Sequence, residues 1–250
     1  MNYYNVMANF WKVVNRVIDE ANIILFVVDA RDAEKSRNIE LENKVQKLGK
    51  KFVYVVNKID LVENTDSIKI RPRVLVSSIK FYGTTILLKK ILSLCRGENC
   101  TVGVIGYPNT GKSSLINALK GKSSASVSSD SGHTKGLQKV RIHPKIVLLD
   151  TPGVYPYKEN DKFRHALIGA KDVSKMDDVI DVAMELIEYL GGAVERYFGV
   201  DVRKDEEETI EELALKMNFL KKGGEPDSER MSRHIIQKWQ KGELNTKMFK

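Results

Sequence analysis

The run Thr101-Val102-Gly103-Val104-Ile105 leads directly into Gly106-Tyr107-Pro108-Asn109-Thr110-Gly111-Lys112-Ser113, which fits the phosphate-loop pattern G-x-x-x-x-G-K-[ST]. Glycines let such a backbone wrap phosphates, and the helix that follows adds its positive end. We therefore predict that Lys112 contacts the β- and γ-phosphates and that the Ser113 hydroxyl binds Mg²⁺. Asn109, Thr110, Gly111 and Ser114 complete the predicted nucleotide contacts.

A second motif lies upstream, in the order opposite to that of an ordinary GTPase. Asn57-Lys58-Ile59-Asp60 offers a carboxylate for the guanine N1–H and amine, an amide, and a lysine stem for one ring face. Ser77 and Ser78 are expected to complete the base pocket. Taken alone, this tetrapeptide could also be a polar turn at a strand end. Its occurrence in the same chain as the phosphate loop and Asp150-Thr151-Pro152-Gly153 favours guanine.

A third motif, Asp150-Thr151-Pro152-Gly153, follows the apolar run from Ile146 to Leu149. We predict that Asp150 approaches Mg²⁺ through water and that the Gly153 amide approaches the γ-phosphate. In most proteins such a tetrapeptide is an ordinary turn. In a chain that also has a phosphate loop, we expect it to be the second motif, after the loop itself, that contacts the Mg²⁺ ion.

Composition limits the class of protein and its partners. The 250 residues carry a net charge of +8, and the positive excess lies in residues 1–160, because residues 161–250 hold 16 basic and 19 acidic side chains. This balance favours a polyanionic partner such as RNA. No apolar run approaches the roughly 20 residues of a membrane span, so we expect a cytoplasmic protein without membrane contact. Cys95 and Cys100 are expected to be reduced.

Hydrophobic periodicity predicts the architecture. Short apolar runs alternate with helical segments up to about residue 161, which predicts an α/β domain, 1–161, with a doubly wound, mainly parallel sheet. Ligands in such sheets bind at the carboxyl ends of strands, where all three motifs occur. From residue 162 onward only helical spacing remains, which predicts an all-α domain, 162–250. The loop between Gly121 and Gly136, rich in Ser, Gly and Lys, is expected to be mobile.

With these motifs in this order, the chain resembles the circularly permuted GTPases that act in ribosome assembly. The resemblance also rests on Asp29-Ala30-Arg31-Asp32 and on Lys222-Gly223-Gly224-Glu225-Pro226-Asp227. It implies a circularly permuted P-loop GTPase fold that binds GTP or GDP with Mg²⁺ and hydrolyses GTP. Its implied partners are the large ribosomal subunit or its precursor and rRNA, and we expect a monomer.

The resemblance also implies roles for further residues. Thr134 is implied as the switch threonine that binds Mg²⁺, so that Lys112, Thr134 and Gly153 form the implied catalytic set. Val154 replaces the glutamine that orients water in many GTPases, which implies slow hydrolysis without a partner. Asn109 is implied either to help hold a K⁺ ion or only to shape the loop. RNA contacts are expected from basic residues of the helical domain: Lys216, Lys221, Lys222, Arg230, Arg233, Lys238 and Lys241, with Trp239 as a stacking group or as core.

Two alternatives to the hydrolysing switch remain open. One is a GTP-binding RNA scaffold that hardly hydrolyses, which Val154 favours. The other is an ATP-using kinase or ATPase, because the phosphate loop alone does not specify guanine.

Overall fold

The computed structural model describes residues 3–121, 137–151, 153, 161–169 and 173–244. The chain forms two compact units: Met1–Asp60 with Asn64–Glu159, which we call the sheet unit, and Leu61–Glu63 with Asn160–Lys250, which we call the helical unit. This boundary after residue 159 separates two compact parts of the chain and does not show that either part is an independent domain. The expectation of separate domains 1–161 and 162–250 stays a prediction.

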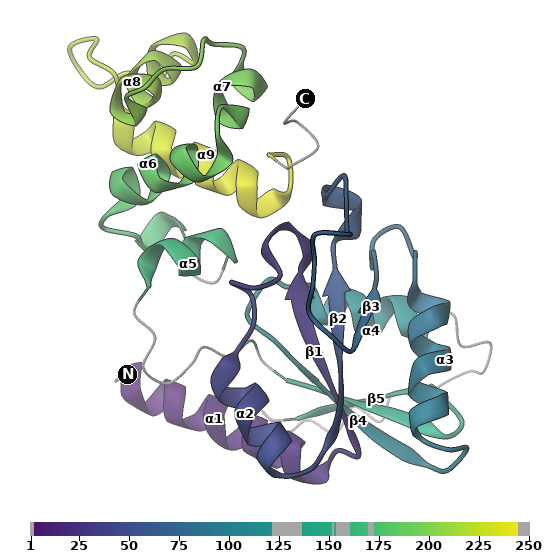
Figure 1. Cartoon of the computed structure of the whole chain (residues 1–250). Coiled ribbons are helices and arrows are strands. Elements are labelled where there is room, and N and C mark those ends of the chain that lie inside the picture. Colours follow the sequence, from purple (N-terminus) through teal and green to yellow (C-terminus); the bar gives the residue numbers. More distant parts are fainter. Residues whose placement is uncertain (1–2, 122–136, 152, 154–160, 170–172, 245–250) are drawn as a thin grey trace. The chain divides into compact units, whose positions relative to one another are not determined.

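Six strands form one sheet in the order β3-β2-β1-β4-β6-β5 (Figure 1). They are β1 (Ile23–Asp29), β2 (Lys51–Asn57), β3 (Arg73–Leu75), β4 (Cys100–Ile105), β5 (Gln138–His143) and β6 (Ile146–Asp150). All pairs are parallel except β5 with β6. Every residue of β1 is buried, as expected of a central strand with helices on both faces. The predicted mainly parallel α/β sheet is confirmed.

Helices cover both faces of this sheet. Helices α3 (Thr84–Leu94) and α4 (Lys112–Lys120) pack their buried leucines against one face, together with Leu25 and Val27 of β1. Helices α1 (Tyr3–Glu20) and α2 (Ile39–Lys47) lie on the other side (Figure 1). Helix α1 approaches β4 at Gly103, where a Cβ atom would lie 2.7 Å from a methyl group of Val17. Glycine therefore allows this helix to pack closely on the sheet.

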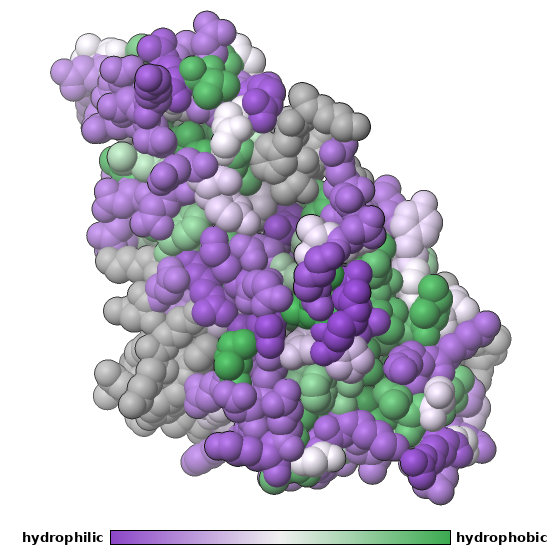
Figure 2. All heavy atoms as spheres, viewed as in Figure 1, coloured by the Kyte–Doolittle hydropathy of each residue, from purple (hydrophilic) through white to green (hydrophobic). Residues whose placement is uncertain are grey.

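Within the described residues, the helices lack the combination of length and apolar character that crossing a membrane requires. In the view of Figure 2, hydrophilic residues cover most of the visible surface and hydrophobic ones appear in small groups.

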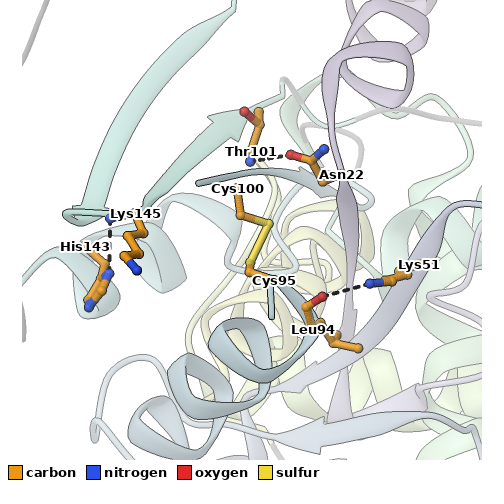
Figure 3. Close-up of a disulfide and its surroundings, with 8 residues drawn as sticks. All are labelled: Asn22, Lys51, Leu94, Cys95, Cys100, Thr101, His143 and Lys145. Atoms are coloured by element: carbon orange, nitrogen blue, oxygen red, sulfur yellow. Dashed lines mark hydrogen bonds between the residues drawn. A yellow bond between two sulfur atoms is a disulfide. The ribbon is translucent and has the colours of Figure 1, made fainter. Parts of the chain in front are cut away.

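The expectation of reduced cysteines is wrong, because Cys95 and Cys100 form a disulfide (Figure 3). Cys95 ends α3 and Cys100 begins β4, and the turn between them brings their Cα atoms to 5.8 Å. Hydrogen bonds hold the surroundings: Lys51 Nζ donates to the Leu94 carbonyl at 2.8 Å, and the Thr101 amide donates to Asn22 Oδ1 at 2.8 Å. The sequence did not predict this disulfide, because a separation of five positions does not by itself indicate that two cysteines are paired.

The described part of the helical unit contains helices and no strand of the sheet. It comprises α5 (Lys162–Leu167), α6 (Val179–Leu190), α7 (Ala193–Phe198), α8 (Glu206–Lys216) and α9 (Ser228–Lys241), with a 3-10 turn at Val173–Lys175. Two further 3-10 turns, Ala30–Asp32 and Ile59–Leu61, follow strands β1 and β2. Its core centres on residues such as Leu186, Ile235 and Trp239. Asp205 caps the amino end of α8 by accepting the amides of Glu207 and Glu208, so the acidic residues that follow it form the first turn of a helix.

Candidate nucleotide-binding site

The strand register brings the three motifs to one edge of the sheet. Asp29 at the end of β1 pairs with Asn57 at the end of β2, while Val104 of β4 pairs with Asp150 at the end of β6. The phosphate loop begins at Gly106, directly after β4. Because the carboxyl ends of parallel strands share an edge, residues far apart in sequence meet there.

The phosphate loop is held by its own carbonyl groups. Lys112 Nζ donates to the carbonyls of Gly106 at 3.0 Å and Tyr107 at 2.7 Å, and Thr110 Oγ1 donates to the Tyr107 carbonyl at 2.9 Å. A Cβ atom at Gly106 would lie 2.4 Å from the carbonyl oxygen of Val27, so only glycine fits there. Helix α4 then begins after Gly111 without a side-chain cap, which leaves its amino end suited to an anion.

Burial shifts the ionisation of the two charged residues beside the loop. Burial lowers the pKa of Lys112 to about 8, and the charge of Asp150 opposes this shift. Burial raises the pKa of Asp150, against the effects of Lys112 and of the Thr151 backbone. Thr151 Oγ1 donates to the Val104 carbonyl at 2.7 Å and fixes the end of β6. An anion and a cation beside this pair would each favour the charged forms.

The residues present fit a magnesium ion. Asp150 Oδ1 is buried and accepts no hydrogen bond, and Ser113 lies exposed in the first turn of α4. Both offer the oxygen atoms that Mg²⁺ prefers. Among the described residues, no group of three or more His, Cys, Asp or Glu side chains is arranged so that it could hold a metal ion. This donor set therefore suits an ion that is completed by phosphates and water, as Mg²⁺ usually is.

Asn57 joins the phosphate loop to the loop at Ser77 and Ser78, which is predicted to read the base. Its Nδ2 donates to the Thr110 carbonyl at 3.0 Å, and its Oδ1 accepts from the Ser78 amide at 3.1 Å and the Ser78 hydroxyl at 2.8 Å. Asn57 is buried. A Cβ atom at Gly111, where φ is 91°, would lie 2.3 Å from Nδ2 of Asn57. The two loops are therefore fitted to each other at a single side chain.

Ser77 positions the carboxylate that is predicted to read guanine. Its hydroxyl donates to Asp60 Oδ1 at 2.5 Å and accepts from the Lys80 amide at 3.1 Å. Ser77 itself is fully buried. Asp60 lies in the 3-10 turn Ile59–Leu61, directly after the strand that ends at Asn57. The structure thus brings Asn57, Asp60, Ser77 and Ser78 together.

Lys58 has a buried partner that was not predicted. Its Nζ lies 2.8 Å from Oδ2 of Asp29, which also pairs with Nη2 of Arg31 at 2.7 Å. Burial alone would raise the pKa of Asp29, but the charges of Arg31 and Lys58 outweigh it and hold that pKa well below its usual range. Burial in turn lowers the pKa of Lys58. Lys58 adopts a φ of 64°, and this ion pair is what holds its ammonium group in place.

The remaining predicted site residues fall into two groups. Gly153 lies against the phosphate loop, because a Cβ atom there would be 2.5 Å from the amide nitrogen of Pro108. Asn109 is exposed, with a φ of 58°. Ser114 is exposed next to Ser113. Thr134, Val154 and the predicted mobile loop lie outside the described residues.

Several expected RNA contacts in the helical unit have structural partners of their own. Arg233 donates to the carbonyls of Val173 and Met176, and Lys238 pairs with Glu243. Trp239 is 1% exposed and donates to the Leu167 carbonyl at 2.6 Å, so it is core and not a stacking group. The basic residues that remain exposed include Lys221, Lys222 and Lys241.

Comparisons with known proteins find a matching GTPase family model and GTP-binding relatives of this chain. A family model described as a 50S ribosome-binding GTPase matches residues 101–221. The match begins at β4, directly before the phosphate loop, and leaves Asn57 and Asp60 upstream of it. The residues that are predicted to read the base therefore precede the matched region, as a circular permutation requires.

Curated relatives extend over nearly the whole chain. An uncharacterized GTP-binding protein of Methanocaldococcus jannaschii is 40% identical over 246 residues, which cover 94% of this chain and 65% of the relative. Nucleolar GTP-binding protein 2 of Saccharomyces cerevisiae is 30% identical over 257 residues, which cover 94% of this chain and 52% of the relative. The chain thus spans about half to two thirds of the length of these relatives.

Solved structures share the fold. The crystal structure of GNP-bound YlqF from T. maritima superposes with a TM-score of 0.68 at 24% identity, covering 94% of this chain and 95% of that chain. The GDP-bound structure of the same protein gives a TM-score of 0.67, also at 24% identity, covering 93% and 95%. At this identity the likeness establishes a common fold.

Proposed function

We propose that the chain is a circularly permuted P-loop GTPase, a switch that binds and hydrolyses GTP, binds rRNA or precursors of the large ribosomal subunit, and assists their assembly. The matched GTPase model and the GTP-binding relatives support this proposal. The observation that carries the nucleotide part is the Asn57 side chain, which bonds to the phosphate loop and to the base-reading loop at once. A guanine nucleotide, which needs one loop for its base and another for its phosphates, fits two loops that are joined in this way.

Each residue near the site has a role in this proposal. Asp60, held by Ser77, accepts the guanine N1–H and amine. Lys112 exchanges its two carbonyl partners for phosphate oxygens, and the Gly153 amide approaches the γ-phosphate. Ser113, Asp150 and Thr134 would hold Mg²⁺. When bound, that ion neutralises charge on the β- and γ-phosphate oxygens.

The guanine assignment has a direct test in nucleotide competition. A fluorescent GDP analogue is bound to the full chain and displaced by GTP or ATP at equal concentrations. The proposal expects displacement by GTP alone, because the Asp60 carboxylate matches the two donors of guanine and not the adenine edge. Displacement by ATP to the same extent would favour the kinase or ATPase alternative and remove the guanine assignment.

Hydrolysis is tested separately from binding. Single-turnover GTP hydrolysis is measured with and without ribosomal particles, and in K⁺ against Na⁺ buffers. We expect slow hydrolysis that particles accelerate, because Val154 stands where many GTPases have a water-orienting glutamine. If neither particles nor K⁺ raise the rate, the second candidate, a weakly hydrolysing GTP-dependent RNA scaffold, is the better description.

The ribosomal partner is supported by the matched family model, described as a 50S ribosome-binding GTPase, and by the positive charge of the chain. Co-sedimentation with large ribosomal subunits, in the GTP-analogue state and in the GDP state, tests it. A nucleotide-gated switch binds in one state far more than in the other. Equal binding in both would contradict gating, and no binding in either would contradict the partner. The expected cytoplasmic location and monomeric state stay predictions.

A further inference from the structure

Four large hydrophobic side chains are exposed within one short segment of the sheet unit, between Ile79 and Ile86. They belong to the loop after β3 and to the first turn of α3, and their exposed fractions are 71% for Ile79, 52% for Phe81, 63% for Tyr82 and 64% for Ile86. We call this set the β3–α3 patch. In Figure 2 the α3 side of the sheet unit shows hydrophobic and hydrophilic residues interleaved. Exposed hydrophobic groups of this kind mark interaction sites.

The segment of the chain that carries the patch has charge of one sign, and the carboxylate next to it in space is Asp60, which accepts from Ser77. From Ser67 to Gly97 the sequence has seven basic residues and no acidic one. The basic residues are Lys69, Arg71, Arg73, Lys80, Lys89, Lys90 and Arg96. Most of them are exposed. This composition repels basic partners and attracts a polyanion.

The loop that carries the two rings is fixed by its own backbone. Phe81 has a φ of 58°, a conformation that bulky residues rarely adopt. The Ser77 amide donates to the Tyr82 carbonyl at 3.0 Å, and Thr84 Oγ1 donates to the Phe81 carbonyl at 3.0 Å. At Gly83, where φ is 70°, a Cβ atom would lie 1.9 Å from the Leu75 carbonyl oxygen. Because the backbone that carries the two rings is already ordered, a partner that binds them loses little free energy in ordering this loop.

We propose that the β3–α3 patch is a docking surface for an unpaired segment of RNA. Exposed aromatic rings offer faces on which bases stack, and the surrounding lysines and arginines neutralise phosphates. Duplex RNA does not offer its base faces, so the patch selects single strands. This surface lies on the sheet unit, and the proposal does not require the helical unit to bind RNA.

The patch begins where the base pocket ends. Ser77 bonds to Asp60 and Ser78 bonds to Asn57, while the next residue, Ile79, already belongs to the patch. A ligand on the patch and a guanine nucleotide therefore contact opposite ends of one short loop. Any coupling between them is reciprocal, so that nucleotide state would alter RNA affinity by the same factor as RNA alters nucleotide affinity.

The test uses the full chain and fluorescence anisotropy with two probes of about 12 nucleotides, an oligouridylate and a duplex RNA, within the range of lengths that single-strand binding folds cover. One variant is Phe81→Asn with Tyr82→Ser, since Asn tolerates a positive φ. A second variant, Lys89→Glu with Lys90→Glu, leaves the loop intact. The matched control is Ile39→Ala with Leu48→Ala, the first residue of α2 and the residue that follows its end, each 49% exposed and outside the patch.

We expect the ring variant to bind oligouridylate at least tenfold more weakly, the charge variant to bind more weakly with a reduced salt dependence, and the control to bind as the unchanged protein does. Affinity for fluorescent GDP without RNA stays within twofold in all three, which shows that they fold. Unchanged oligouridylate affinity in the first two variants, or equal affinity of the unchanged protein for duplex, overturns the proposal.

Co-sedimentation with ribosomal subunits separates this inference from the proposed function. If the unchanged protein pellets with subunits and both patch variants pellet equally well, the patch fails and the proposed function stands. If the unchanged protein binds oligouridylate but not subunits, the proposed partner fails and the patch stands. Variants that lose subunit binding but keep oligouridylate affinity point to a protein partner on the patch, which contradicts RNA docking.

Discussion

Replacing Asn57 by alanine removes three hydrogen bonds at once, one to the Thr110 carbonyl and two from Ser78. A buried hydrogen bond contributes about 0.5–1.5 kcal/mol, and the partners left unsatisfied add to the loss. We therefore expect the native arrangement of the two loops to lose about 2–4 kcal/mol. If nucleotide binding needs both loops in place, this corresponds to a loss of affinity of about 30- to 1,000-fold.

Hydrogen exchange resolved by peptide, together with titration of fluorescent GDP, measures this effect. Exchange should rise in residues 77–84 and also in residues 106–113, because Asn57 bonds to both segments. Ser78→Ala removes only one of the three bonds, the hydroxyl one, and should cost about 1 kcal/mol. The matched control is Asn22→Ala, which removes one exposed bond from the Thr101 amide at the opposite end of the same sheet.

Two results would refute the reasoning. The first is a loss of GDP affinity in Asn57→Ala no larger than in Asn22→Ala, since Asn57 would then not link the site. The second is an increase of exchange confined to residues 77–84, because the bond to Thr110 would then contribute nothing to the phosphate loop.

Three further predictions address other parts of the chain. Asp60→Asn should shift preference from guanine to xanthine nucleotides by tenfold or more, measured by competition, and unchanged preference would mean that the carboxylate held by Ser77 does not read the base. Lys112 has a pKa of about 8 without nucleotide and is charged below it, so affinity for GTP should fall as pH rises from 8 to 9.5. Lys112→Arg, which keeps its charge throughout, should lose this pH dependence, and a slope that persists would assign it to another group. Trp239→Ala should destabilise the helical unit by about 3–5 kcal/mol, together with the loss of its bond to Leu167. Urea unfolding measures that cost, and a simultaneous loss of GDP affinity would contradict the separation of the two units.

The predicted strands are those that carry the motifs, because a buried parallel strand is a continuous apolar run that ends in polar ligand-binding residues. Strand β5 was missed because its sequence, Gln138–His143, is polar and only Ile142 is fully buried. An antiparallel edge strand needs few apolar residues, and propensity alone cannot identify it.

The partners of Lys58 were also beyond prediction. Asp29 lies 29 positions earlier, and the two meet only because β1 and β2 pair with Asp29 opposite Asn57. A sequence motif reveals which residues a ligand needs, but the second layer of contacts depends on strand register. The same holds for Ser77 and Asp60, whose hydrogen bond joins two different loops.

The two sides of the Asn57 amide also imply an order of events during synthesis. Its oxygen is satisfied by Ser78, 21 positions later, whereas its nitrogen must wait for Thr110, 53 positions later. Because synthesis starts at the amino end, Ser78 leaves the ribosome before Thr110, so the partner of the oxygen is present before the partner of the nitrogen. The proposed nucleotide site is thus incomplete until β4, which pairs with β1, has emerged. A nascent chain halted before Thr110 would leave the Asn57 nitrogen without the partner that it has in the structure.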